Sequence, residues 1–408
     1  MAIRYTRGAA LATASAVFML GVVATPADAR TQSGHEIPGI ALDWQRTALR
    51  TVYAEAASPV PSSALYLGFT SLAVDDAVRT ARERRNVSAS AAAAVAAHDV
   101  LIAYFPASAA NLNADLTTSL AAIPDGPAER RGTAIGRAAA TKMIASRVDD
   151  GRNASIVYTR DPAPGIWQPG PTGMAVAWLG FVKPLVLRQA VSVDGPDPID
   201  SAAYAADFDE VKRLGSENSA ERTEAQTETA RFFSANPILQ LREALLLHLD
   251  SHPLSLARTT RLFAELDAAT ADALIQGWRL KYDVGFWRPF QAIPAAATDG
   301  NDATTADPDW KPLMATPAYP DYVSGHACVV GAFTSTVSPI LGDGVALRLH
   351  YPVTNTDRTY PSLRALESDA FMARIWLGFH FRDAMDDGYR IGHLTGKLVK
   401  DQYRQART

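Results

Sequence analysis

Three short segments in the last third of the chain hold most of the side chains that could carry chemistry. They are Lys281–Pro289 (Lys-Tyr-Asp-Val-Gly-Phe-Trp-Arg-Pro), Ser324–His326 (Ser-Gly-His) and Arg374–His380 (Arg-Ile-Trp-Leu-Gly-Phe-His). Together they supply three cations, two histidines and a Ser-Gly pair within largely apolar sequence. Cations and free backbone N–H groups bind oxyanions, and a histidine beside them can transfer protons or bond to the central atom. The segments therefore predict a site for a compact, multiply charged oxyanion.

The first segment contributes Lys281 and Arg288. They are seven residues apart, two turns of a continuous helix, so we expect them on one helix face. Pro289 then ends or bends that helix. The surrounding aromatic residues are Trp278, Tyr282, Phe286, Trp287 and Phe290. Cations among such side chains are partly desolvated and bind an anion more strongly. The alternative is a solvated pair at the surface.

The second segment reads as a helix start, with Ser324 in the N-cap position before an apolar run. Backbone N–H groups at such a start can face an anion, and Gly325 allows close approach. His326 then lies in the first turn, where it suits general acid/base work. The alternative is an ordinary capped helix with an incidental histidine. Ser324 lacks the Gly-x-Ser-x-Gly context of a hydrolase nucleophile.

In the third segment, Arg374 lies six residues before His380. On a continuous helix this spacing would put the two side chains on different faces. Gly378 permits a break between them, and a break would let both side chains reach one pocket. His380 is then a ligand or nucleophile. The alternative is a buried structural histidine.

Other residue types that often carry chemistry give weaker signals. Cys328 is the one cysteine, which excludes an intramolecular disulfide, and we expect a small buried helix residue rather than a nucleophile. His248 and His252 have a zinc-like spacing, but the motif's glutamate is missing and Pro253 follows directly. We therefore expect no metal site of that type.

The elements that must position these segments read as helices, with no convincing strand alternation and no internal repeat. The expected helices cover residues 40–57, 61–85, 88–104, 127–148, 199–215, 219–234, 236–249, 255–284, 324–341, 366–379 and 383–404. Residues 151–198 are rich in proline and form a long loop, which we expect to be ordered because Trp167 and Trp178 favour burial. The sequence thus predicts a mainly α fold of packed bundles.

Length and charge limit the function classes. The chain has 408 residues, 48% of them hydrophobic, so a sizeable core is expected. A net charge of −4 does not indicate nucleic acid or an acidic membrane as partner. Residues 1–29 read as a cleavable secretory signal peptide ending in Ala27-Asp28-Ala29, so we expect a secreted, extracytoplasmic protein without stable membrane insertion. Small molecules are the expected partners, and a homodimer is left open.

The three segments occur along the chain in the order Lys-x6-Arg-Pro, Ser-Gly-His, Arg-x5-His. This order and spacing resemble the signature of the superfamily of type 2 phosphatidic acid phosphatases (PAP2) and vanadium-dependent haloperoxidases. The flanking Phe-Trp-Arg-Pro, Pro-Asp-Tyr-Val-Ser-Gly-His and Leu-Gly-Phe-His-Phe-Arg are more similar to its secreted bacterial haloperoxidase-related branch. The resemblance implies an all-α fold of two helical bundles. We expect an N-terminal half over residues 30–235, with the loop 151–198, and a C-terminal half over 236–408 that carries the site.

The resemblance also implies roles. His380 would be the vanadium ligand in a haloperoxidase, or the phosphohistidine nucleophile in a phosphatase. His326 would be the general acid/base, and Lys281 would act on bound peroxide. The residues implied to hold the oxygens of vanadate or phosphate are Lys281, Arg288, Ser324, Gly325 and Arg374. One pocket serves both chemistries because five-coordinate vanadate resembles a phosphoryl-transfer transition state.

Three positions depart from the family pattern. Val323 stands where phosphatases have proline, and Ala384 stands where they have the aspartate four residues after the second histidine. Asp383 and Asp387 are the candidates to orient His380 instead, and the carboxylate partner of His380 is left open. Tyr319 occupies the position, seven before the acid/base histidine, that tunes haloperoxidases, so the halide preference is open.

From these observations we expect a vanadate-dependent haloperoxidase that oxidises halide with hydrogen peroxide. The alternative is a secreted acid phosphatase that hydrolyses phosphomonoesters and needs no cofactor. A third hypothesis is a catalytically idle, oxyanion-binding helical protein.

Overall fold

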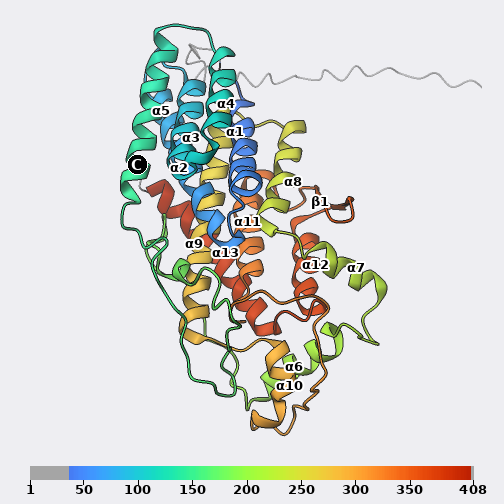
Figure 1. Ribbon diagram of the computed structural model, residues 1–408. Helices are drawn as coiled ribbons and strands as arrows, with labels where there is room; N and C mark the ends of the chain where they lie inside the picture. The colour runs from blue at the N-terminus through green and yellow to red at the C-terminus, as the bar shows by residue number, and fades with distance from the viewer. Residues whose placement is uncertain (1–35, 406–408) are drawn as a thin grey trace, which may run out of the picture. The chain divides into compact units, whose positions relative to one another are not determined.

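Helices account for most of the computed structural model, which describes residues 36–405. Within this range there are thirteen α-helices and one β-hairpin (Figure 1). The helices are α1 (Ile40–Leu49), α2 (Val60–Arg82), α3 (Ala89–Tyr104), α4 (Ala109–Ala121), α5 (Pro127–Ser146), α6 (Ala202–Gly215), α7 (Glu224–Phe232), α8 (Pro237–Ser251), α9 (Leu256–Val284), α10 (Pro289–Ala295), α11 (Gly325–Leu341), α12 (Leu363–Trp376) and α13 (Arg382–Gln405). The prediction of an all-α fold is confirmed.

Side-chain caps set where many helices begin. Ser88, Ser201, Ser255 and Ser324 each accept a hydrogen bond from a backbone N–H in the first turn of the helix that follows. Such a cap satisfies one of the N–H groups that a helix start leaves unpaired, and it stabilises the helix by about 1 kcal/mol. The predicted start at Ser324 is thereby confirmed.

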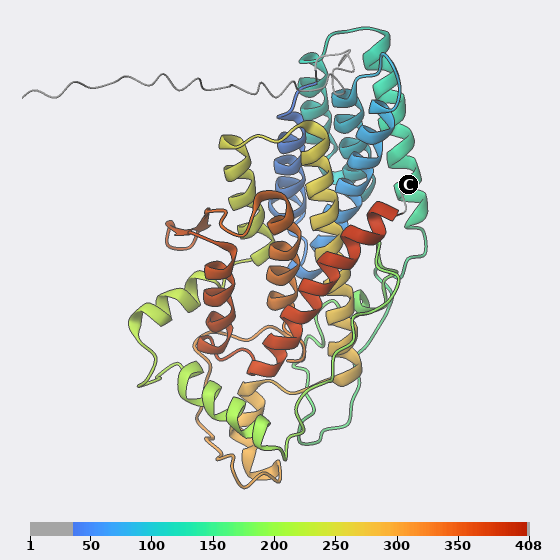
Figure 2. The ribbon, with the colours of Figure 1, turned by 180° about the vertical axis from the view of Figure 1, so that it is seen from behind.

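The 29-residue helix α9 is the element on which the others pack. Most of its residues are buried, and it packs against α2, α11 and α13. From behind, α13 (red) lies beside α11 (orange) and α9 (yellow), as Figure 2 shows. Lys281 lies in the last turn of α9, so its position is set by a long buried helix.

The proline-rich stretch 151–198 is an ordered loop, as predicted, and contains the short 3-10 segment η3 (Ala177–Phe181). Trp167 is buried. The Asp272 carboxylate on α9 accepts hydrogen bonds at 2.6–2.9 Å from three successive backbone N–H groups at residues 185–187. The loop is thereby fixed to the central helix.

The expectation of no strands was wrong at one place. Strands β1 (Leu347–Tyr351) and β2 (Thr356–Tyr360) pair as an antiparallel hairpin, with Leu347 opposite Tyr360. Residues 347, 349 and 351 are buried while 348 is exposed, which is the alternation of a half-buried strand. Helices α4 and α10 were also not predicted. The signal peptide lies outside the described residues, and the division at residues 235 and 236 stays a prediction. Among residues 36–405, no helix is both long and apolar enough to span a membrane.

Candidate active site

One pocket of about 410 Å³ receives side chains from the second and third segments. Gly325 and His326 reach it from the start of α11, and Arg374 from the end of α12. His380 reaches it from the connection between α12 and α13. Lys281, Arg288 and Ser324 are fully buried, and Arg288 Nη1 is 3.5 Å from His380 Nε2. The structure therefore brings the predicted residues of all three segments together.

The predicted break at Gly378 is present. Helix α12 ends at Trp376, and Gly378 has a φ of +72°, in the left-handed region. A Cβ at this position would come within 2.5 Å of the Gly215 carbonyl oxygen, so neighbouring backbone also requires glycine. The break turns the chain so that Arg374 and His380 line the same pocket.

The expectation that Lys281 and Arg288 share a helix face was wrong. Helix α9 ends at Val284 because Gly285 adopts a left-handed conformation with a φ of +63°, and Arg288 is the N-cap residue of α10. The two cations still converge, since the centre of the Tyr319 ring lies 4.9 Å from Lys281 Nζ and 5.0 Å from the Arg288 guanidinium carbon. Desolvation of both cations, which the aromatic surroundings predicted, is confirmed.

Backbone carbonyls hold the cations in place. Arg288 donates to Tyr319 O at 2.7 Å and to Phe379 O at 2.8 Å. Lys281 Nζ donates to the carbonyls of residues 320 and 321 at 2.7 and 2.9 Å. Arg374 Nη1 donates to the carbonyl of residue 233 at 3.2 Å. Fixed cations of this kind bind an anion without further ordering.

The start of α11 adds backbone donors. The Ser324 hydroxyl accepts from Ala327 N at 3.3 Å, which places the first N–H groups of the helix at the pocket. A Cβ on Gly325 would lie 2.8 Å from a carbon of the Trp278 ring, so the close packing there needs glycine. Ser324 N donates to Ala384 O at 2.8 Å, so Ala384 contacts the site through its backbone.

The carboxylate next to His380 is one that sequence reasoning missed. Asp321 Oδ1 lies 2.8 Å from His380 Nδ1, an ion-pair distance in an orientation that does not meet hydrogen-bond angles. Neither of the two candidates, Asp383 and Asp387, fills this place. Asp383 accepts from Asp197 N at 3.2 Å, and Asp387 binds the Tyr322 hydroxyl. The Asp in Pro-Asp-Tyr-Val-Ser-Gly-His was the available signal.

Burial and neighbouring cations shift the pKa values of the site. The pKa of His380 and that of His326 are both lowered well below the usual range, mainly by burial and further by cations including Arg374, so both rings are neutral near pH 7. Burial also lowers the pKa of Lys281, and that of Arg374 to about 10. Burial raises the pKa of Asp321 to about 7, although Arg288 and Lys281 oppose the shift. An anion in the pocket would relieve the mutual repulsion of the cations.

Several buried donors at this site have no partner within the described part of the chain. They are the donors Arg288 Nη2 and Arg374 Nε, and the ring nitrogen Nε2 of His326 likewise has no partner there. Unpaired buried polar atoms are costly, and a ligand is one way to satisfy them. Guanidinium donors, the N–H groups of a helix start and a neutral imidazole suit vanadate or phosphate. The residues present therefore fit the implied oxyanion.

Tyr319 and Val323, the two remaining departures from the family pattern, differ in whether they line the pocket. Tyr319 lines the pocket and its ring covers the two cations. Val323 is fully buried and is not among the residues that line the pocket.

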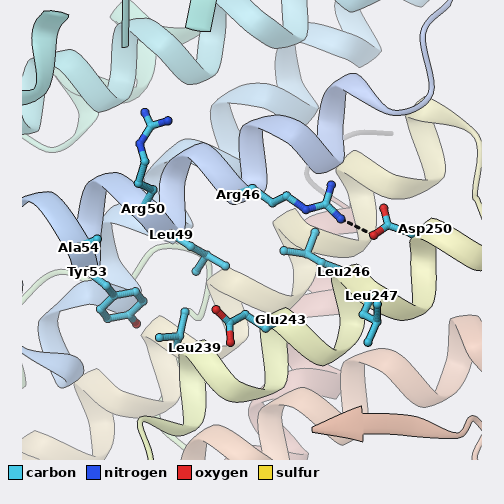
Figure 3. Close-up of a pocket in the computed structure, with 10 residues that line it drawn as sticks. All are labelled: Arg46, Leu49, Arg50, Tyr53, Ala54, Leu239, Glu243, Leu246, Leu247 and Asp250. Atoms are coloured by element: carbon cyan, nitrogen blue, oxygen red, sulfur yellow. Dashed lines mark hydrogen bonds and ion pairs between the residues drawn. The ribbon is translucent and has the colours of Figure 1, made fainter. Parts of the chain in front are cut away.

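The weaker candidates do not join the site. Cys328 is buried, as predicted. The His248 and His252 rings stack at 4.3 Å, and residues 36–405 contain no group of three or more His, Cys, Asp or Glu suited to a metal ion. A separate pocket of about 510 Å³ lies between α8 and the helical segment 40–55, lined by leucines, two arginines and two carboxylates (Figure 3). None of the predicted site residues lines it.

Comparisons with known proteins agree with this arrangement. Residues 261–408 match the protein-family model described as the VCPO second helical-bundle domain. An 82-residue stretch is 37% identical to vanadium chloroperoxidase of Curvularia inaequalis, covering 18% of this chain and 13% of that relative's length.

Solved structures share the fold. A bacterial vanadium-dependent iodoperoxidase superposes with a TM-score of 0.73 at 19% identity, covering 91% of this chain and 98% of that one. A holo-type bacterial vanadium-dependent chloroperoxidase gives a TM-score of 0.67 at 17% identity, covering 85% and 92%. The described fold is that of the bacterial vanadium haloperoxidases.

Proposed function

Because residues 261–408 of this chain belong to the vanadium haloperoxidase family, we propose that it is a vanadate-dependent haloperoxidase that oxidises halide with hydrogen peroxide. The observation that carries the proposal is that His326, Arg374 and His380 line one pocket, with partnerless buried nitrogens on His326, Arg374 and Arg288, and that the Arg288 guanidinium lies 3.5 Å from His380 Nε2. Such nitrogens could bond to an oxyanion bound at His380.

Specific residues would hold the cofactor. His380 would bind vanadium through Nε2, while Arg288, Arg374, Lys281, the Ser324 hydroxyl and the Gly325 N–H would bind the vanadate oxygens. When bound, vanadate supplies a Lewis-acidic centre at which hydrogen peroxide reacts with a halide.

The remaining chemistry belongs to protein side chains. His326 is neutral because burial and Arg374 lower its pKa, so its Nε2 can accept a proton from incoming peroxide and later return it. The Tyr319 ring covers Lys281 and Arg288 and keeps water from them, which strengthens their attraction for an anion. The charge of the cations offsets the negative charge of the oxyanion during turnover.

Most of the residues that line the pocket are apolar. Among the residues that line it, Ile238 and Leu274 are buried, whereas Val60 and Met314 are each 36% exposed. A pocket of about 410 Å³ exceeds the space that peroxide and a halide need. We therefore propose that the small-molecule substrates of this protein include an apolar organic compound that accepts the oxidised halogen.

The test is an assay of purified protein for iodide and bromide oxidation by peroxide, with and without orthovanadate, beside hydrolysis of an aryl phosphate. Vanadate-dependent oxidation that is lost in His380→Ala and kept in His252→Ala supports the proposal. Phosphatase activity that vanadate inhibits would assign the pocket to the phosphatase alternative. The absence of both activities, together with no binding of vanadate or phosphate, would contradict the oxyanion site itself.

We also propose that the protein is secreted through residues 1–29 and acts on small molecules without nucleic-acid or membrane partners. N-terminal sequencing of the exported protein tests the first point. A mature chain starting near Arg30 is expected, and a retained Met1 would contradict export by cleavage.

A further inference from the structure

One buried carboxylate lies against the proposed ligand histidine. Asp321 Oδ1 is 2.8 Å from His380 Nδ1, and the side chains are 1% and 2% exposed. The two residues come from different elements, since Asp321 lies in the connection that leads into α11 and His380 in the one between α12 and α13. The backbone also fixes Asp321, whose N–H donates to Phe286 O at 2.9 Å.

The carboxylates nearer to His380 in sequence do not reach it. The position four residues beyond is Ala384, and Asp383 and Asp387 are bonded to Asp197 N and to the Tyr322 hydroxyl. Asp321 is therefore the carboxylate at His380 among the described residues. This chain supplies the partner from the segment before the Ser-Gly-His motif.

The opposite edge of the ring faces the cations. His380 Nε2 is 3.5 Å from Arg288 Nη1, and His380 lines the pocket. A carboxylate beside Nδ1 favours the tautomer with the proton on Nδ1, which leaves the Nε2 lone pair free to bond.

We propose that Asp321 is the positioning residue of His380. Its carboxylate, in ion-pair contact with Nδ1 at 2.8 Å, favours the tautomer with the proton on Nδ1 by electrostatic attraction and thereby leaves Nε2 free for the oxyanion. The consequence for vanadate rests on the proposed function, whereas the consequence for the His380 tautomer does not. Asp321 does not touch the oxyanion and takes no part in bond making.

A competing role for Asp321 predicts the opposite change in vanadate affinity when this residue is replaced. Asp321 also interacts with Lys281 and Arg288, so it could act only as their counter-ion. Removing a counter-ion makes the pocket more positive and raises its affinity for every anion. Removing a positioning residue lowers the affinity for vanadate, which needs the Nε2 bond. The substitution Asp321→Asn keeps the side-chain shape and separates the two.

The first experiment measures vanadate binding by equilibrium dialysis for wild type, Asp321→Asn and the matched controls Asp383→Asn and Asp387→Asn. We expect a loss of about 10- to 100-fold in affinity for Asp321→Asn, as for other residues that orient metal ligands, and less than about 3-fold for the controls. Unchanged or higher affinity in Asp321→Asn would overturn the proposal. If the wild type does not bind vanadate, the proposed function fails and the second experiment decides the role of Asp321.

The second experiment reads the tautomer of the wild-type protein directly. In ¹⁵N-histidine-labelled protein, the signal that disappears in His380→Ala belongs to His380. We expect it to show a protonated Nδ1 and an unprotonated Nε2, with a mixture of tautomers in Asp321→Asn. A proton on Nε2 in the wild type would overturn the proposal, even if the Asp321→Asn protein did not fold.

Discussion

Replacing Gly378 by alanine tests whether the break after α12 places the site. Gly378 has a φ of +72°, and an added Cβ would lie 2.5 Å from the Gly215 carbonyl oxygen and 2.9 Å from the Trp310 ring. The left-handed conformation costs alanine about 1–2 kcal/mol, and overpacking against fixed backbone adds about 1–3 kcal/mol. The free energy of unfolding of Gly378→Ala should therefore fall by about 2–5 kcal/mol.

Two other glycines separate these contributions. Gly300 has a φ of +75° but no atom within 4 Å of an added Cβ, so Gly300→Ala should lose only about 1–2 kcal/mol. Gly344 has neither feature, and Gly344→Ala should change stability by less than about 1 kcal/mol. Urea unfolding of the three variants, followed by circular dichroism, gives the three free energies.

The same substitution should weaken the site. Arg374 and His380 flank Gly378, and a shift of about 1 Å between groups that act together can cost about 100-fold. We expect Gly378→Ala to lose at least about 10-fold in vanadate affinity under conditions where it remains folded, while Gly300→Ala binds normally. If Gly378→Ala were as stable as Gly344→Ala and bound vanadate equally well, the reasoning from the break would be refuted.

Three further predictions concern single side chains. His326 is kept neutral by burial, so below about pH 6.5 the unfolded chain binds a proton that the folded chain does not. The free energy of unfolding of wild type relative to His326→Gln should therefore fall by up to about 1.4 kcal/mol for each unit by which the pH is lowered. Urea unfolding from pH 7 to 5 measures this difference, and a difference that does not change with pH would contradict the prediction. Ser324→Ala should lose about 1 kcal/mol of stability with the cap of α11 and also bind vanadate more weakly, whereas the corresponding change at Ser255, which caps α9 at its far end, should affect stability alone. Arg374→Lys removes the partnerless Nε donor and should weaken vanadate binding by about 10-fold or more in equilibrium dialysis. Equal vanadate affinity of the two proteins would show that only the positive charge at this position contributes to binding.

Local sequence signals predicted most of the helices and the members of the site. Ser324 before an apolar run indicated a capped helix start, and Gly378 indicated a break; both are present because capping and positive φ are local properties. The cations around Lys281 and Arg288 were expected to be desolvated because of their aromatic neighbours, and they are buried.

Other features depend on contacts that a linear pattern does not contain. Gly285 ends α9 before Arg288, so helical spacing was the wrong guide there, and Tyr319 brings the two cations together from a distant segment. Asp321 reaches His380 across 59 positions of sequence, although the local pattern favoured nearer carboxylates. In the hairpin, Leu347–Tyr351 alternates between apolar and polar residues over only five positions, and Thr356–Tyr360 does not alternate, so the linear pattern contained no convincing strand signal.

The central claim is that His380 binds vanadium inside a pocket of fixed donors. The most direct test is a crystal structure of the protein soaked in orthovanadate, with anomalous scattering used to locate vanadium. The account predicts one vanadium within bonding distance of His380 Nε2, with its oxygens contacted by Arg288, Ser324 and Arg374. A peak in the pocket between α1 and α8 alone, or no peak in crystals soaked at saturating vanadate, would contradict it.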